Sequence, residues 1–135
     1  MTLLVDTSVW SLAFRRDTPA DVPEVAALAR ALAGADLVVT AGVVLVELLT
    51  GMLPPRVERT LAEQIAPMNL IEPTRDDYLA AAALINECRR LGVQLKTVDA
   101  VIAQLAIAND LTLLTTDRDF EHAAEHIPLR LWRAT

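Results

Sequence analysis

Two aspartates, Asp6 and Asp117, stand at the ends of short apolar runs of the kind that form buried strands. The runs are Leu3–Val5 and Leu111–Thr115. The carboxyl ends of parallel strands meet at one edge of a sheet, where ligands bind, so the two acids become neighbours if their strands are adjacent. Each aspartate could instead cap the following helix, and Asp119 fits either a cap or a further carboxylate of the site.

Asp99 lies in the first turn of an expected helix and shares a face with apolar residues. Its neighbours at helical spacing are Ile102, Ala103 and Ala106, so the carboxylate points along a buried stripe. The helix dipole favours an aspartate in a first turn by about 0.3–1 kcal/mol, but this does not account for the apolar face. We therefore favour a functional role for Asp99.

Glu47 repeats this pattern in another expected helix. Its neighbours one turn away are Val43 and Gly51, which are apolar or small. We expect Glu47 to point inward. The alternative is a side chain that reaches solvent from a helix end.

Four such acids in one pocket predict a divalent cation. Each carboxylate raises the pKa of its neighbours, so all four stay ionised only if positive charge joins them. Mg²⁺ or Mn²⁺ prefers oxygen ligands, whereas zinc recruits histidine or cysteine. His122 and His126 lack a companion ligand and are expected at the surface, and Cys88 is expected to pack inside a helix.

Length and composition are those of one compact domain spanning residues 1–135. The chain has a mass of 14.7 kDa, and 53% of its residues are hydrophobic. It contains no signal peptide and no apolar stretch long enough to span a membrane. A single cysteine suits a reducing compartment, so we expect a cytoplasmic protein.

The charge balance limits how the chain can bind nucleic acid. Its 18 acids outnumber its 12 bases, giving a net charge of −6, and Lys96 is the only lysine. This excludes a broad basic binding surface but permits local contacts to phosphates. Arg15, Arg16, Lys96 and Arg118 are the candidates, with solvated surface charge as the alternative for each.

The elements expected to position these residues alternate between strands and helices. Expected strands are 3–5, 37–40, 68–71, 111–115 and an edge strand over Leu129–Trp132. Expected helices are 9–14, 24–33 with Asp21 as N-cap, 42–52, 56–66, 74–91 with a capping box at Thr74, 98–109 with Thr97 as cap, and one from about Asp119. The alternation predicts an α/β fold with a mostly parallel sheet of about five strands and helices on both faces.

Four motifs in order resemble PIN-domain ribonucleases of the VapC type, the toxins of bacterial type II toxin–antitoxin pairs. The resemblance covers essentially the whole chain. The motifs are LVDTSVW from Leu4, VELLTG from Val46, TVDAVIA from Thr97 and LTTDRDF from Leu114.

The resemblance implies a PIN-like three-layer α/β/α fold with an acidic site formed by Asp6, Glu47, Asp99 and Asp117. Asp119 would be a more variable fifth acid, and Thr115 a supporting hydroxyl. It also implies RNA hydrolysis with Mg²⁺ or Mn²⁺, a homodimer, and inhibition by a cognate antitoxin protein.

The hypothesis that follows is phosphodiester hydrolysis by a metal-bound water. Asp6 and Asp99 are the best direct ligands, Asp117 comes next, and Glu47 either binds a second ion or positions the water. Thr7 and Ser8 either start the following helix or also bind the water and phosphate.

Two other classes of function are weighed against the nuclease. A receiver-like phosphoacceptor domain also gathers acids and Mg²⁺ at strand ends, but its lysine follows a late strand, whereas Lys96 precedes a helix. A catalytically silent PIN fold that acts as an interaction module would keep the same acids. An aspartate-nucleophile phosphatase would want an acid where Ser8 stands.

Overall fold

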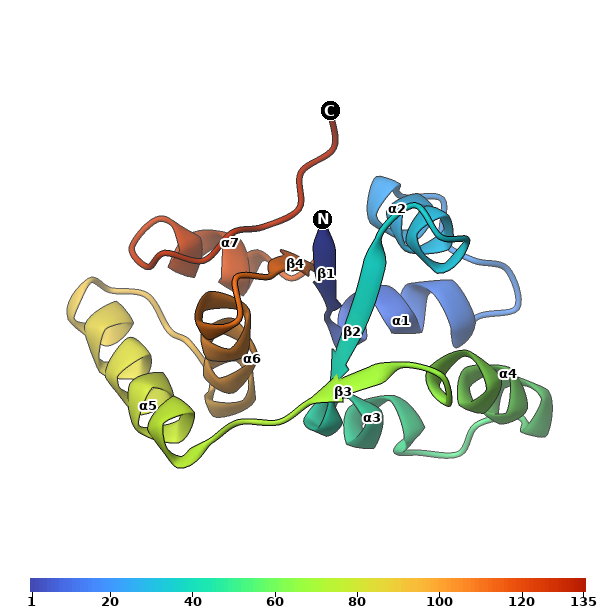
Figure 1. The fold of residues 1–135 in the computed structure, drawn as a ribbon, viewed down its shortest axis with the longest axis horizontal. Coiled ribbons are helices and arrows are strands. Elements are labelled where there is room, and N and C mark those ends of the chain that lie inside the picture. The colour runs from blue at the N-terminus through green and yellow to red at the C-terminus, as the bar shows by residue number, and fades with distance from the viewer.

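Figure 1 shows the computed structural model, which describes residues 1–135, as a central sheet with helices on both sides. The strands are β1 (Thr2–Val5), β2 (Leu37–Ala41), β3 (Asn69–Ile71) and β4 (Thr112–Leu114). The helices are α1 (Thr7–Phe14), α2 (Pro23–Leu32), α3 (Gly42–Leu49), α4 (Pro55–Ile65), α5 (Arg75–Arg90), α6 (Thr97–Ala108) and α7 (Arg118–Ala124). The expected α/β fold with a parallel sheet is confirmed.

The strand order is β3-β2-β1-β4, and every pair is parallel. β1 is a central strand, and its residues Leu3, Leu4 and Val5 are fully buried because helices cover both faces of the sheet. β1 pairs directly with β4, with Val5 opposite Leu114. The segments that follow these two strands therefore leave the sheet side by side.

Helices α1, α2 and α4 lie on one side of the sheet in Figure 1, and α5, α6 and α7 on the other. The core between these layers is continuous and comprises 29 buried residues, of which Trp10 and Phe120 have the largest fully buried side chains. Trp10 comes from α1 and Phe120 from α7, so both helices that follow the site strands are fixed by an aromatic anchor.

The expected edge strand over Leu129–Trp132 is reduced to a single bridge. Leu131 pairs in parallel with Leu113, and the sheet proper has four strands. Two backbone hydrogen bonds join this segment to Leu113, one from the N–H of Trp132 and one to the carbonyl of Arg130. Pro128 precedes the segment and has no N–H to donate, which limits a ladder on that side.

Helix starts agree with the sequence in one case and differ in two. Thr74 forms the expected capping box with Asp77 at the start of α5. The N-cap of α2 is Val22 rather than Asp21, and Pro23 at the first helical position supplies the helical φ. The N-cap of α6 is Lys96, which places Thr97 inside the first turn.

The longest helix, α5, has 16 residues. None of the helices combines the length and apolar character that crossing a membrane requires.

Candidate active site

Asp6 is the only buried acid, with 5% of its surface exposed. It directly follows β1, and its backbone N–H donates to the carbonyl of Leu114 at 2.9 Å, which ties it to the end of β4. Although Asp6 occupies the N-cap position of α1, its side chain makes no cap hydrogen bond. The alternative interpretation of this carboxylate as a helix cap is therefore wrong.

Two hydroxyl groups hold one oxygen of the Asp6 carboxylate. Ser8 and Thr115 donate to the same oxygen, Oδ2, at 2.8 Å and 2.9 Å. The other oxygen, Oδ1, accepts no hydrogen bond within the chain, and it is not among the polar atoms that are both buried and unpartnered. One oxygen is thus fixed by the protein and the other is left accessible to a ligand or water.

Asp117 reaches the same place from the neighbouring strand. It is the N-cap of α7, and its Oδ1 accepts the N–H of Asp119 at 2.9 Å, so the cap interpretation holds for this residue. Its own N–H donates to the hydroxyl of Thr115 at 3.0 Å. Thr115 therefore links the two acids, because the same hydroxyl that accepts from Asp117 donates to Asp6.

Asp99 enters from the first turn of α6 and is partly buried. Burial, and after it the negative charges of Asp6, Asp117 and Glu47, together raise the pKa of Asp99 to about 6, while the charge of Lys96 opposes them. Each of these three acids is thus close enough to act on Asp99 electrostatically. The four acids singled out from the sequence converge on one region of the structure.

Glu47 differs from its expected placement. Its side chain is exposed rather than turned into an apolar interior. It accepts a hydrogen bond from the Thr7 hydroxyl at 2.8 Å, which connects α3 to the start of α1. The reason for the exposure is that α3 spans only eight residues and lies at the surface, where Val46 beside it is also 66% exposed.

The donor set fits a hard divalent cation. Carboxylate oxygens of Asp99, Asp117 and Asp119 all lie within 4.8 Å of one another, and no histidine or cysteine belongs to this group. Oxygen-only ligands suit Mg²⁺ or Mn²⁺ better than zinc.

Sequence reasoning understated Ser8. Besides donating to Asp6, its Oγ accepts the backbone N–H of Thr116 at 3.1 Å and lies 3.4 Å from the Thr115 hydroxyl. Its position two residues after Asp6 was the available signal, because a hydroxyl at that spacing can return to the carboxylate through a local turn. His122 and His126 are exposed, as expected, and Cys88 is fully buried.

The four candidate substrate-binding cations form no ion pair with the acids of the site. Arg16, Lys96 and Arg118 are exposed, and none of them forms an ion pair. Arg15 is partly buried and donates to the carbonyl of Thr50 at 3.5 Å.

Several solved structures have the same fold as this chain. FitAcB from Neisseria gonorrhoeae is 19% identical, with a TM-score of 0.73 over 97% of this chain and 96% of that chain. VapBC2 from Rickettsia felis, solved bound to a DNA fragment from its promoter, is 19% identical, with a TM-score of 0.76 over 98% of both chains. VapBC-1 from nontypeable Haemophilus influenzae is 17% identical, with a TM-score of 0.68 over 98% and 97%.

Comparison with curated proteins found no match. The family model for the PIN domain matches residues 3–126, a range that contains β4, all of β1 except Thr2, and all five acids. Together with the shared fold, this match establishes that the chain belongs to the PIN domain family.

Proposed function

We propose that this protein is a metal-dependent ribonuclease that hydrolyses RNA phosphodiester bonds as the toxin of a toxin–antitoxin pair. The observation that carries the proposal is the convergence of Asp99, in the first turn of α6, with Asp6 and Asp117, which follow adjacent strands. The pKa of Asp99 is raised to about 6 there. Such clustered acids without a compensating base are costly for folding and are typical of functional sites.

Asp99, Asp117 and Asp119 would hold a Mg²⁺ or Mn²⁺ ion, because their carboxylate oxygens lie within 4.8 Å of one another. Asp6 is outside this group, and we propose that its free Oδ1 adds a further ligand. When bound, the ion supplies a water of lowered pKa and stabilises negative charge on the phosphate. Ser8 and Thr115 keep the Asp6 carboxylate oriented, because both donate to its Oδ2.

Glu47 is proposed to position the attacking water. Thr7 holds its Oε1, so the second carboxylate oxygen remains free to accept a proton from that water. The oxygen of the water forms the new bond to phosphorus while the bond from phosphorus to the 3′-oxygen breaks. The products are a 5′-phosphate and a 3′-hydroxyl.

The toxin role draws on the structural neighbours, one of which was solved as a toxin–antitoxin complex from Klebsiella pneumoniae. We propose a cognate antitoxin as a protein partner, a homodimer as the working form, and the cytoplasm, where RNA and antitoxin are found, as the location. A hollow of about 210 Å³ between α1 and α4, lined in part by Phe14, Val57 and Arg16, is a fitting seat for an antitoxin segment.

The two competing functions receive less support. The family match favours a nuclease over a receiver-like phosphoacceptor domain. A silent PIN fold has no need for hydroxyls that orient Asp6, yet two of them do so here.

The test is cleavage of total RNA by purified protein, with Mg²⁺, with Mn²⁺ and with EDTA. We expect fragments that carry 5′-phosphates when either metal is present and none in EDTA, and addition of excess Mg²⁺ should restore cleavage. Cleavage that persists in EDTA would contradict the metal dependence. Folded protein that cuts no RNA under any condition would leave the silent interaction module as the better account.

A further inference from the structure

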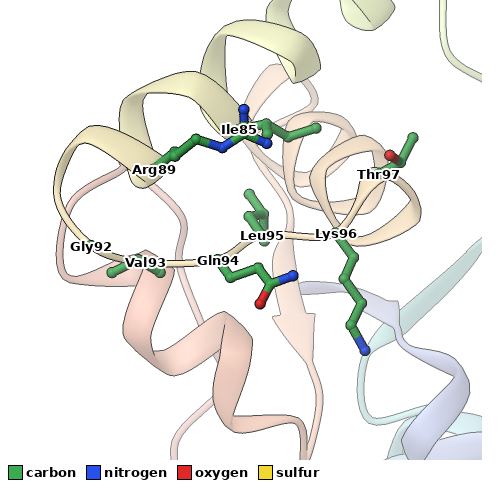
Figure 2. Close-up of a pocket in the computed structure, with 8 residues that line it drawn as sticks. All are labelled: Ile85, Arg89, Gly92, Val93, Gln94, Leu95, Lys96 and Thr97. Atoms are coloured by element: carbon green, nitrogen blue, oxygen red, sulfur yellow. The ribbon is translucent and has the colours of Figure 1, made fainter.

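A hollow of about 590 Å³ lies between the end of α5 and the start of α6. Figure 2 shows the residues around it, with Arg89 on α5 at one side and Lys96 at the other, and the loop of Gly92 to Leu95 between them. We call it the basic hollow, after Arg89 and Lys96. Its volume falls within the range of about 300–1,000 Å³ that is usual for sites of small ligands.

One end of the basic hollow adjoins the acidic site. Lys96 is the N-cap of α6, and Asp99 is the third residue of the same helix. The two residues are therefore separated by less than one turn of the helix. The charge of Lys96 accordingly acts on Asp99, where it opposes the effect of the surrounding acids.

Both cations of the basic hollow are free to bind an anion. Neither Arg89 nor Lys96 forms an ion pair, whereas Arg130 lies 2.8 Å from its acid Asp110. The N–H groups of Gln94 and Lys96 donate no backbone hydrogen bond. The dipole of α5 favours arginines in its last turn and so explains why Arg89 stands there. It does not explain why Arg89 lines the same hollow as Lys96, the only lysine of the chain.

We propose that the basic hollow binds the RNA strand beside the bond that is cut, with Arg89 and Lys96 contacting the phosphates of the flanking nucleotide. This inference rests on the proposed ribonuclease function. A polyanion must approach a chain of net charge −6 at a cluster of acids, so a pair of free cations next to the cluster lowers the repulsion where the strand enters. Phosphate contacts of this kind position a strand without reading its sequence.

The test compares Arg89→Gln with Arg90→Gln. Arg90 is the next residue of the same helix turn, is also exposed, and does not line the basic hollow. The readouts are KM and kcat for cleavage of a labelled single-stranded RNA in Mg²⁺, measured over a range of salt concentrations. Thermal unfolding verifies that both variants fold.

For Arg89→Gln we expect KM to rise about fivefold at roughly 0.1 M salt and the slope of log KM against log salt to fall by about 0.7, because one phosphate contact is lost. The value of kcat should stay unchanged, since the contact is equally strong in the ground state and the transition state. Arg90→Gln should match wild type. For Lys96→Gln the slope of log KM against log salt should fall by the same amount. Its kcat should change as well, because Lys96 adjoins Asp99.

Equal salt slopes for Arg89→Gln and Arg90→Gln would overturn the inference while leaving the ribonuclease intact. Polyglutamate could also bind in a way that depends on Arg89 while Arg89→Gln leaves RNA cleavage unchanged. That result would assign the hollow to an acidic protein segment and would also overturn the inference. If wild type cuts no RNA, the hydrolysis proposal fails. Binding of the labelled RNA, measured by its anisotropy, then tests separately whether the basic hollow binds RNA. Binding that depends on Arg89 but not on Arg90 would support it, and binding equal in both variants would not.

Discussion

Acidic side chains occur at both ends of the parallel sheet, but only those at the amino ends of the strands are paired with basic groups. Asp110, just before β4, lies 2.8 Å from Arg130, and Asp36, just before β2, lies 3.5 Å from the amine of Met1. At the carboxyl ends, Asp6 and Asp117 have no basic partner within ion-pair distance.

The acids at the amino ends are neutralised by basic partners, whereas the acids at the carboxyl ends keep a negative charge that a reaction could use. Exposed ion pairs contribute about 0–1 kcal/mol each, so the amino-end pairs do little more than neutralise surface charge. At the carboxyl ends the hydroxyls of Ser8 and Thr115 take the place of bases. Hydroxyls orient a carboxylate without cancelling its charge, which leaves the charge available to a cation.

The largest expected effect is on catalysis at the carboxyl ends. Asp6→Asn and Asp99→Asn should each lower the rate of RNA cleavage by about 10²-fold or more, because each removes a charge that the reaction uses. Asp110→Asn is the matched control at the amino ends and should cut RNA at the wild-type rate. Asparagine suits this position, since residue 110 has a φ of 55°. Wild-type cleavage by folded Asp99→Asn protein would remove the distinction between the two ends.

A smaller effect is expected when a supporting hydroxyl is removed. Thr115→Val keeps the shape of the side chain but deletes the donor to Asp6 and the acceptor for the Asp117 N–H, so kcat should fall by about tenfold. Thr112→Val, at the amino end of the same strand, should leave kcat unchanged. Equal rates for the two valine variants would show that hydroxyl support is not specific to the carboxyl ends.

The pKa of Asp99 predicts a change in stability with pH. Its value rises from 3.8 in the unfolded chain to about 6 in the fold, so between these pH values the native state holds a proton that the unfolded state has released. The free energy of unfolding contributed by Asp99 therefore falls as pH rises through this window. At pH 7.5 in EDTA, Asp99→Asn should be more stable than wild type by about 1 kcal/mol after allowance for solvent screening.

Urea unfolding at pH 4 and pH 7.5 measures this difference. The gap between variant and wild type should open toward pH 7.5 and close when Mg²⁺ is added, because the ion would stabilise only the wild-type cluster. A difference in the free energy of unfolding that is constant with pH would show that the pKa of Asp99 is not raised in the fold.

The smallest effect is expected at the amino ends. Asp110→Asn breaks the exposed pair with Arg130 and should lower the free energy of unfolding by less than about 1 kcal/mol, with no change in its response to Mg²⁺. Thermal unfolding with and without the metal checks both points. If stabilisation by Mg²⁺ depended on Asp110, part of the cation binding would lie at the amino ends of the strands, which contradicts the assignment.

Much of the fold could be predicted from local patterns. Leu3–Val5 was predicted as a buried strand because a parallel strand covered on both faces reads as a continuous apolar run. Helix starts were less predictable, since Asp21 and Thr97 are good caps by type but each stands one residue away from the N-cap position. One residue of shift in a helix start is decided by packing rather than by cap chemistry.

The site was predictable in its acids and less so in its contacts. Asp6 and Asp117 were found from their positions at strand ends, and Asp99 from its place on an apolar helix face. The exposure of Glu47 agrees with the alternative interpretation rather than the favoured one, because the apolar pattern around it does not reveal which face of α3 meets solvent. The role of Ser8 was left open, because its contact with Thr116 joins residues that lie 108 positions apart.

The sequence by itself determined the types of the elements and the acids that their ends carry, because hydrophobic periodicity and side-chain chemistry are local properties. Only the tertiary structure decided that β4 pairs with β1, and therefore that Thr115 reaches Asp6 across 109 positions of the chain. Strand order depends on how all the layers bury their apolar faces together. The contact between the Thr115 hydroxyl and the Asp6 carboxylate is consequently a property of the assembled sheet.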